Sequence, residues 1–182
     1  MFRSLCIVIL LAGSASAQTT QAMVEGRVEA LLAGIEHVPT PADWEAAGPT
    51  EMVARALLDV AQRADARVST RARALVGMRY APTEGVRAYL ESVASDAAAL
   101  PTLRGKAALS LGKVAQGAAL PVLTRLLESD DPALREDALR GVAEVRTREA
   151  INVLVAHEGR EAVPHVRELA RTLADALRPT VP

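Results

Sequence analysis

Residues 131–145 read DPALREDALRGVAEV, and this stretch decides the fold. Asp131 is suited to cap a helix and Pro132 to occupy its first position, because proline needs no N–H there and its fixed φ already matches a helix. From Leu134 to Val145, apolar residues recur at spacings of three and four. This spacing predicts a helix that packs one apolar face closely against a neighbour.

The same series occurs four times, and its copies begin 35, 31 and 32 residues apart. A period of this length with helical spacing is typical of stacked helical hairpins, each too small to bury its apolar face without the next. The sequence therefore predicts an all-α protein, a right-handed α-solenoid of about four antiparallel hairpins. The copies are Val68/Ala72/Val76, Leu103/Ala107/Leu111/Val114, Leu134/Ala138/Val142/Val145 and Val166/Ala170/Ala174/Leu177.

Capping residues and prolines between the copies predict where each helix begins and ends. Thr50 and Asp65 are the expected N-caps of the first hairpin, and Pro179 prevents continuation after the last one. The expected helices cover residues 50–63 and 66–79, 83–93 and 100–115, 118–128 and 132–145, and 148–157 and 160–177.

A helical apolar stripe over residues 22–38, ended by Pro39 and Pro41, precedes the repeats. An uncovered end of a solenoid would expose its core to water, so we expect this helix to cap the first hairpin. Trp44 is expected to fold back over the same end as a buried anchor. The alternative is that Trp44 is the aromatic residue of a binding site.

The run from Asp131 to Val142 resembles the inner helix of a HEAT repeat, of the short kind similar to that of phycobilisome-lyase-like proteins. Family members typically show Asp-x-x-Val/Leu-Arg-x-x-Ala followed by small and aliphatic residues. The other copies match more loosely, and Ser69 stands where arginine is usual. The likeness spans about Glu51 to Arg178. It implies a scaffold for protein interactions most often and an enzymatic role only occasionally.

The first residues have the layout of a secretory signal peptide. Arg3 gives a basic start, an apolar run covers residues 5–12, and Ala15-Ser16-Ala17 forms a small-x-small cleavage site before Gln18. The apolar run is far shorter than the ~20 residues of a spanning helix. We therefore expect a periplasmic or extracellular protein with no membrane span after cleavage. Its expected parts are a signal peptide (1–17), an N-terminal capping helix and entry segment (18–49), helical repeats (50–178) and a tail (179–182).

The composition argues against nucleic acid as a partner. The chain has 21 basic against 22 acidic residues and only 2% aromatic residues. A nucleic-acid-binding protein would show a basic surface or an aromatic stacking platform, so no nucleic acid is expected. The single cysteine, Cys6, lies in the leader, and packing alone must hold the mature chain.

Motifs for catalysis are missing from the sequence. No phosphate-binding glycine loop, dinucleotide fingerprint or nucleophile elbow occurs. We interpret the acidic pairs Asp130-Asp131 and Glu136-Asp137 as caps and solvated faces. The histidines His37, His157 and His165 are interpreted as ordinary solvated side chains rather than metal ligands. The sequence therefore predicts no catalytic residue, no metal and no cofactor.

The surface of the inner helices remains as the candidate contact site. Counting 100° per residue from the buried positions places an uncharged strip of α-helical residues farthest from the core. In the second hairpin the strip comprises Gly105, Ala108, Leu109 and Gly112 and carries no charge; the corresponding positions of the third hairpin are Glu136, Leu139, Arg140 and Ala143. A strip of small residues would admit a partner helix or peptide closely. The alternative is that neighbouring inner helices lean together and bury it.

A charged edge flanks this strip and changes sign along the solenoid. Lys106 and Lys113 lie on the second hairpin, and Asp137 and Glu144 follow on the third. Opposed patches of this kind would orient a partner of complementary charge. The leading hypothesis is an exported, non-catalytic adaptor for an unidentified protein or peptide. The alternatives are an enzyme-accessory or small-molecule-binding domain related to lyase-associated members of the family, and a structural subunit of an envelope assembly.

Overall fold

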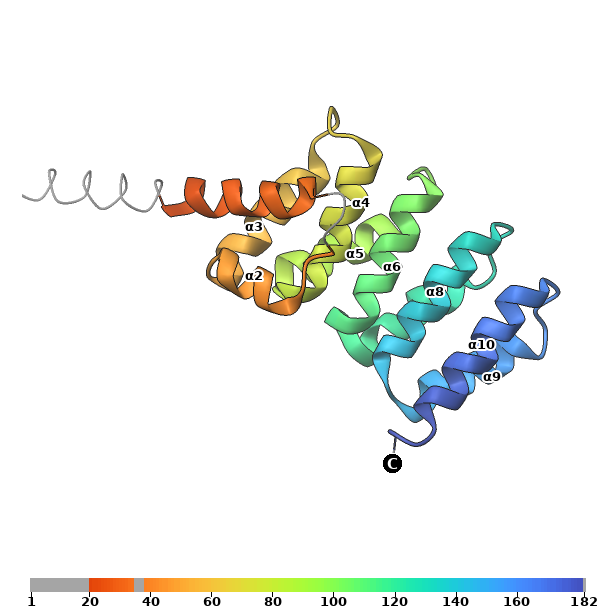
Figure 1. The fold of residues 1–182 in the computed structure, drawn as a ribbon. Helices are drawn as coiled ribbons and strands as arrows, with labels where there is room; N and C mark the ends of the chain where they lie inside the picture. Colours follow the sequence, from red (N-terminus) through yellow and green to blue (C-terminus); the bar gives the residue numbers. More distant parts are fainter. Residues whose placement is uncertain (1–19, 35–37, 182) are drawn as a thin grey trace, which may run out of the picture.

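The computed structural model describes residues 20–34 and 38–181, and all regular elements within these residues are helical (Figure 1). The expected signal peptide and His37 lie outside the described residues. A helix over residues 20–33 is followed by α2 (Pro41–Ala47), α3 (Thr50–Gln62), α4 (Val68–Gly77), α5 (Glu84–Ser95), α6 (Pro101–Ala115), α7 (Leu120–Leu126), α8 (Pro132–Val145), α9 (Arg148–Glu158) and α10 (Pro164–Leu177). Two short 3-10 helices follow α4 and α6, at Met78–Tyr80 and Gln116–Ala119.

These helices form four hairpins, and the hairpins stack into a solenoid. Each hairpin pairs an outer helix with an inner one: α3 with α4, α5 with α6, α7 with α8, and α9 with α10. The inner helices α4, α6, α8 and α10 lie side by side in one layer (Figure 1). The predicted all-α solenoid of about four hairpins is confirmed. Within the described ranges, no helix is long and apolar enough to cross a membrane.

The first repeat begins two residues later than the sequence pattern predicts. Val68 stands at the exposed start of α4, with 41% of its surface accessible, whereas Ala74 is completely buried. Ala74 therefore takes the place predicted for Ala72. In this register Arg71 precedes the buried Ala74 by three residues, as the arginine does in the other three copies. Arg71, and not Ser69, therefore occupies the arginine position of the first repeat.

The same position holds an arginine in every hairpin, and we call Arg71, Arg104, Arg135 and Arg167 the arginine ladder. Each ladder residue donates a hydrogen bond to a carbonyl at the end of the preceding outer helix or just after it. The acceptors are Ala61 (2.9 Å), Ala94 (3.4 Å), Ser129 (2.8 Å) and Glu161 (3.0 Å), in chain order. Carbonyls at a helix C-terminus have no partner within the helix and attract cations. The ladder thus ties the two helices of every hairpin together.

The N-terminal end of the solenoid is covered as expected. Val24, Val28 and Leu32 of the helix over residues 20–33 are buried against the core, and Trp44 of α2 is only 4% exposed. Thr40 begins α2 through a capping box with Asp43, in which each side chain binds the other residue's backbone N–H. Trp44 is therefore a buried anchor of the cap.

Two predicted N-caps are wrong. Pro49, not Thr50, occupies the N-cap position of α3, and Arg67 rather than Asp65 precedes α4. Neither Pro49 nor Arg67 forms a side-chain hydrogen bond that caps its helix. Asp131 caps α8 as predicted, because its side chain accepts a hydrogen bond from the Ala133 N–H at 2.9 Å.

Candidate functional site

A cavity of about 290 Å³ opens between the N-terminal cap and the inner helices. The cap contributes apolar side chains to one side, and α4 with the following turn contributes the other. The lining residues are Leu32, Val38, Pro39, Trp44, Ala72, Arg73, Val76, Gly77, Tyr80 and Lys106. Two of these described lining residues are cationic and none is acidic. The cavity is therefore an apolar hollow with a basic margin.

An aromatic pair forms one wall of the cavity. The rings of Trp44 and Tyr80 stack with an interplanar angle of 15° and centroids 6.4 Å apart. Gly77 makes this wall possible, because a Cβ at that position would lie 3.0 Å from two carbons of the indole ring. The glycine thus lets the cap anchor reach the surface of α4.

Cations surround Tyr80. The Nζ of Lys113 lies 5.0 Å from the centre of the Tyr80 ring, and the guanidinium carbon of Arg79 lies 5.9 Å from it. Both distances suit a cation–π attraction. On the cap side, Arg73 donates a hydrogen bond to the Leu31 carbonyl at 3.3 Å and so holds the N-terminal helix against α4.

The uncharged strip predicted as a contact surface is mostly buried, and that expectation is wrong for Gly105, Ala108, Gly112 and Leu139. A Cβ on Gly112 would overlap the Gly141 carbonyl oxygen and lie 2.7 Å from its carbon. Gly105, Ala108 and Gly112 of α6 face α8, because these small residues let the backbones of α6 and α8 come into contact. The alternative, in which inner helices lean together, is the one observed. Leu109 remains half-buried at the surface.

The predicted charged edge exists, but three of its four charges, Lys106, Asp137 and Glu144, already have ion-pair partners. Lys106 binds Asp137 across the α6–α8 contact at 2.8 Å, and Arg79 forms an ion pair with Glu144. Charges of opposite sign on neighbouring helices therefore neutralise each other along this edge. Within the described part of the chain Lys113 has no carboxylate partner, so one cation of the edge remains available beside the cavity.

Two acidic residues expected on solvated faces have specific partners. Asp137 has a side chain that is only 13% exposed. Glu136 accepts a hydrogen bond from Arg140 at 3.0 Å and lies 3.1 Å from Nε2 of His165. Arg140, predicted as a contact residue, is 43% exposed and keeps part of its surface on the inner face.

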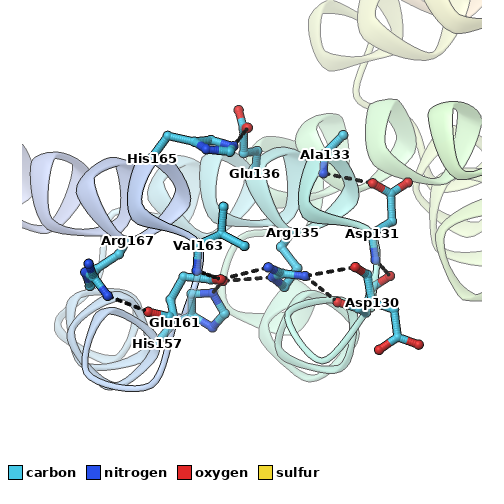
Figure 2. Close-up of polar contacts among 11 residues, drawn as sticks. Asp130, Asp131, Ala133, Arg135, Glu136, His157, Glu161, Val163, His165 and Arg167 are labelled. Carbon is cyan, nitrogen blue, oxygen red and sulfur yellow. Dashed lines mark hydrogen bonds and ion pairs between the residues drawn. The ribbon is translucent and has the colours of Figure 1, made fainter.

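His157 is also not the solvated side chain that the sequence predicts. It is 3% exposed, and its Nε2 lies 2.7 Å from Oε2 of Glu161 (Figure 2). His165 is exposed, as expected. Residues 20–34 and 38–181 contain no group of three or more histidine, cysteine, aspartate or glutamate side chains arranged to hold a metal ion.

Glu161 is the centre of a buried polar cluster that joins the last two hairpins. Arg135 of the arginine ladder binds its carboxylate with two nitrogens, at 2.7 and 2.8 Å, and the Val163 N–H adds a bond of 2.9 Å (Figure 2). The Arg135 hydrogen bonds, with further help from Val163 and His157, lower the pKa of Glu161 to about 2. The carboxylate is almost fully enclosed, so the cluster lies inside the contact between the last two hairpins.

Comparison with known proteins agrees with this architecture. Residues 97–174 match the family model described as HEAT repeats. One solved structure that resembles the chain is the crystal structure of an engineered protein, a target of the Northeast Structural Genomics Consortium. It is 18% identical, with a TM-score of 0.51, over 86% of this chain and 79% of that chain. At this identity the likeness shows the fold alone. Comparison with curated proteins gives no match.

Proposed function

We propose, from the premise that residues 97–174 are HEAT repeats of an α-solenoid, that this chain is an exported, non-catalytic scaffold that binds a protein or peptide along its inner helices. HEAT solenoids stack hairpins into extended surfaces that serve protein interactions. The observation that supports this role most strongly is the mainly apolar cavity between the cap and α4, at whose rim Val38 is 85% exposed. Exposed apolar residues beside a hollow commonly mark binding surfaces.

The size and lining of the cavity favour a polypeptide over a small metabolite. Small-molecule sites usually enclose ~300–1,000 Å³ and place a small number of polar groups to orient the ligand. This cavity lies just below that range, and its two charged side chains, Arg73 and Lys106, already bind the Leu31 carbonyl and Asp137. A non-catalytic role is further supported by the enclosure of His157 and Glu161, whose side chains are almost completely buried.

Export is the part of the proposal that rests on sequence alone. The layout of residues 1–17 predicts cleavage after Ala17. Intact-mass spectrometry of the protein from its native host is expected to find a mature chain that begins at Gln18. A dominant species that begins at Met1 and remains in the membrane fraction would contradict export.

The scaffold role itself is tested by purification of the mature, C-terminally tagged protein from the native envelope fraction. We expect a second polypeptide to copurify in a fixed ratio and to be released by excess untagged protein. Recovery of the chain with a bound small molecule would favour the accessory-domain alternative. Recovery only of large assemblies of the chain itself would favour a structural subunit.

A further inference from the structure

We infer that the cavity beside Trp44 binds an acidic segment of the partner polypeptide, which inserts one large apolar side chain and places its carboxylates next to Lys113. This inference rests on the proposed function and specifies the chemistry of the partner. Three features carry it: the volume of the cavity, the exposed Val38 at its rim and the exposed cation of Lys113 beside it.

The volume suits a side chain. An apolar cavity of about 150 Å³ can hold a benzene ring, so about 290 Å³ accommodates a phenylalanine or leucine side chain with part of its backbone. The half-buried ring of Tyr80, which stacks on the buried Trp44, presents a wall against which such a side chain packs well. Burial of one large apolar side chain contributes about 1.5–3 kcal/mol.

Two apolar residues of the cap, Val38 and Pro39, lie at the rim of the cavity. Val38 lines the cavity and is 85% exposed, and Pro39 follows it. Covering an apolar side chain that is so open to water lowers the free energy of the bound state. The rim therefore extends the apolar contact beyond the hollow itself.

One cation beside the cavity has no carboxylate partner among the described residues. Arg79 pairs with Glu144 and Lys106 with Asp137, whereas Lys113 lies over the ring of Tyr80. Lys113 is the exposed cation of this group, and the low dielectric of the apolar wall strengthens its field. A segment with carboxylates beside its apolar anchor complements this surface, whereas a basic segment is repelled.

Selection of random peptides displayed on phage against the mature chain tests the inference. We expect enriched peptides to carry a large apolar residue flanked by aspartate or glutamate. The dissociation constant of a synthetic copy is then measured by fluorescence anisotropy with two variants. Val38→Asp adds an acidic group at the rim, and Lys113→Glu reverses the exposed cation; each is expected to weaken binding tenfold or more.

Matched controls lie on the outer helices. Val155→Asp changes an exposed valine of α9, and Arg55→Glu reverses an exposed cation of α3; both should bind the peptide as wild type does. Failure to enrich peptides, enrichment of basic or uncharged peptides, or binding unchanged in Val38→Asp and Lys113→Glu would overturn the inference. If the copurifying envelope protein still binds both variants, the scaffold role stands and its site lies elsewhere on the chain.

Discussion

Gly112→Ala is expected to lower the free energy of unfolding by about 2–4 kcal/mol. In the middle of a helix, alanine is normally more stable than glycine by about 1 kcal/mol. Here the new Cβ would overlap the carbonyl group of Gly141, and the obstacle is backbone, which no change of rotamer can move aside. The inner helices α6 and α8 would have to separate along their length.

Urea unfolding followed by circular dichroism measures this effect. Gly26→Ala is the matched control, because Gly26 is an exposed helical glycine with no heavy atom within 4 Å of an added Cβ. It is expected to raise the stability by about 0.5–1 kcal/mol. Equal stability gains in Gly26→Ala and Gly112→Ala would show that α6 and α8 do not touch at this point.

Glu161→Gln is expected to cost about 3 kcal/mol at neutral pH, although the two side chains have nearly the same shape. The amide removes the charge that compensates Arg135, whose side chain is only 12% exposed. An unpaired charge in such a place is strongly unfavourable, whereas the same change in an exposed pair is almost neutral. Glu168→Gln is the control, since Glu168 and its partner Arg171 are both more than half exposed.

The effect of Glu161→Gln depends on pH in a defined direction. The pKa of Glu161 is lowered to about 2 in the folded protein from a usual value of 4.5. Its carboxylate therefore contributes about 3 kcal/mol of stability above pH 4.5, and this contribution is lost as the pH falls toward 2. We expect wild type to lose stability over this interval and the variant to lose less. Parallel pH profiles would contradict the role of the cluster.

The helices of the repeats are largely encoded in local sequence. Pro132 and Asp131 set the start of α8, and the observed span Pro132–Val145 equals the predicted one. The first repeat was misplaced because α4 is rich in alanine and aliphatic residues, so two apolar registers fit it almost equally well. Arg71 distinguishes them, since only the register with Ala74 puts an arginine on the ladder.

The contact surface was harder to predict because it depends on neighbouring hairpins. A helical projection of α6 alone shows which residues face its own outer helix, but Gly105 and Gly112 are buried by α8. The pairing of Lys106 with Asp137 follows from the same close approach. Glu161 lies in a connecting turn, 26 residues after Arg135, and no spacing rule links the two. The cavity likewise requires Tyr80 and Trp44 to meet through tertiary packing.

The central claim, that the inner helices bind a polypeptide, is tested most directly by site-specific photo-crosslinking in the native host. One crosslinking residue replaces Leu109, which lies on the same side of α6 as Lys106 and Lys113, and another replaces the exposed Arg125 on the outer helix α7. We predict a discrete adduct with one partner polypeptide from position 109 and none from position 125. No adduct at position 109, or equal adducts from both positions, would contradict a scaffold that binds through its inner face.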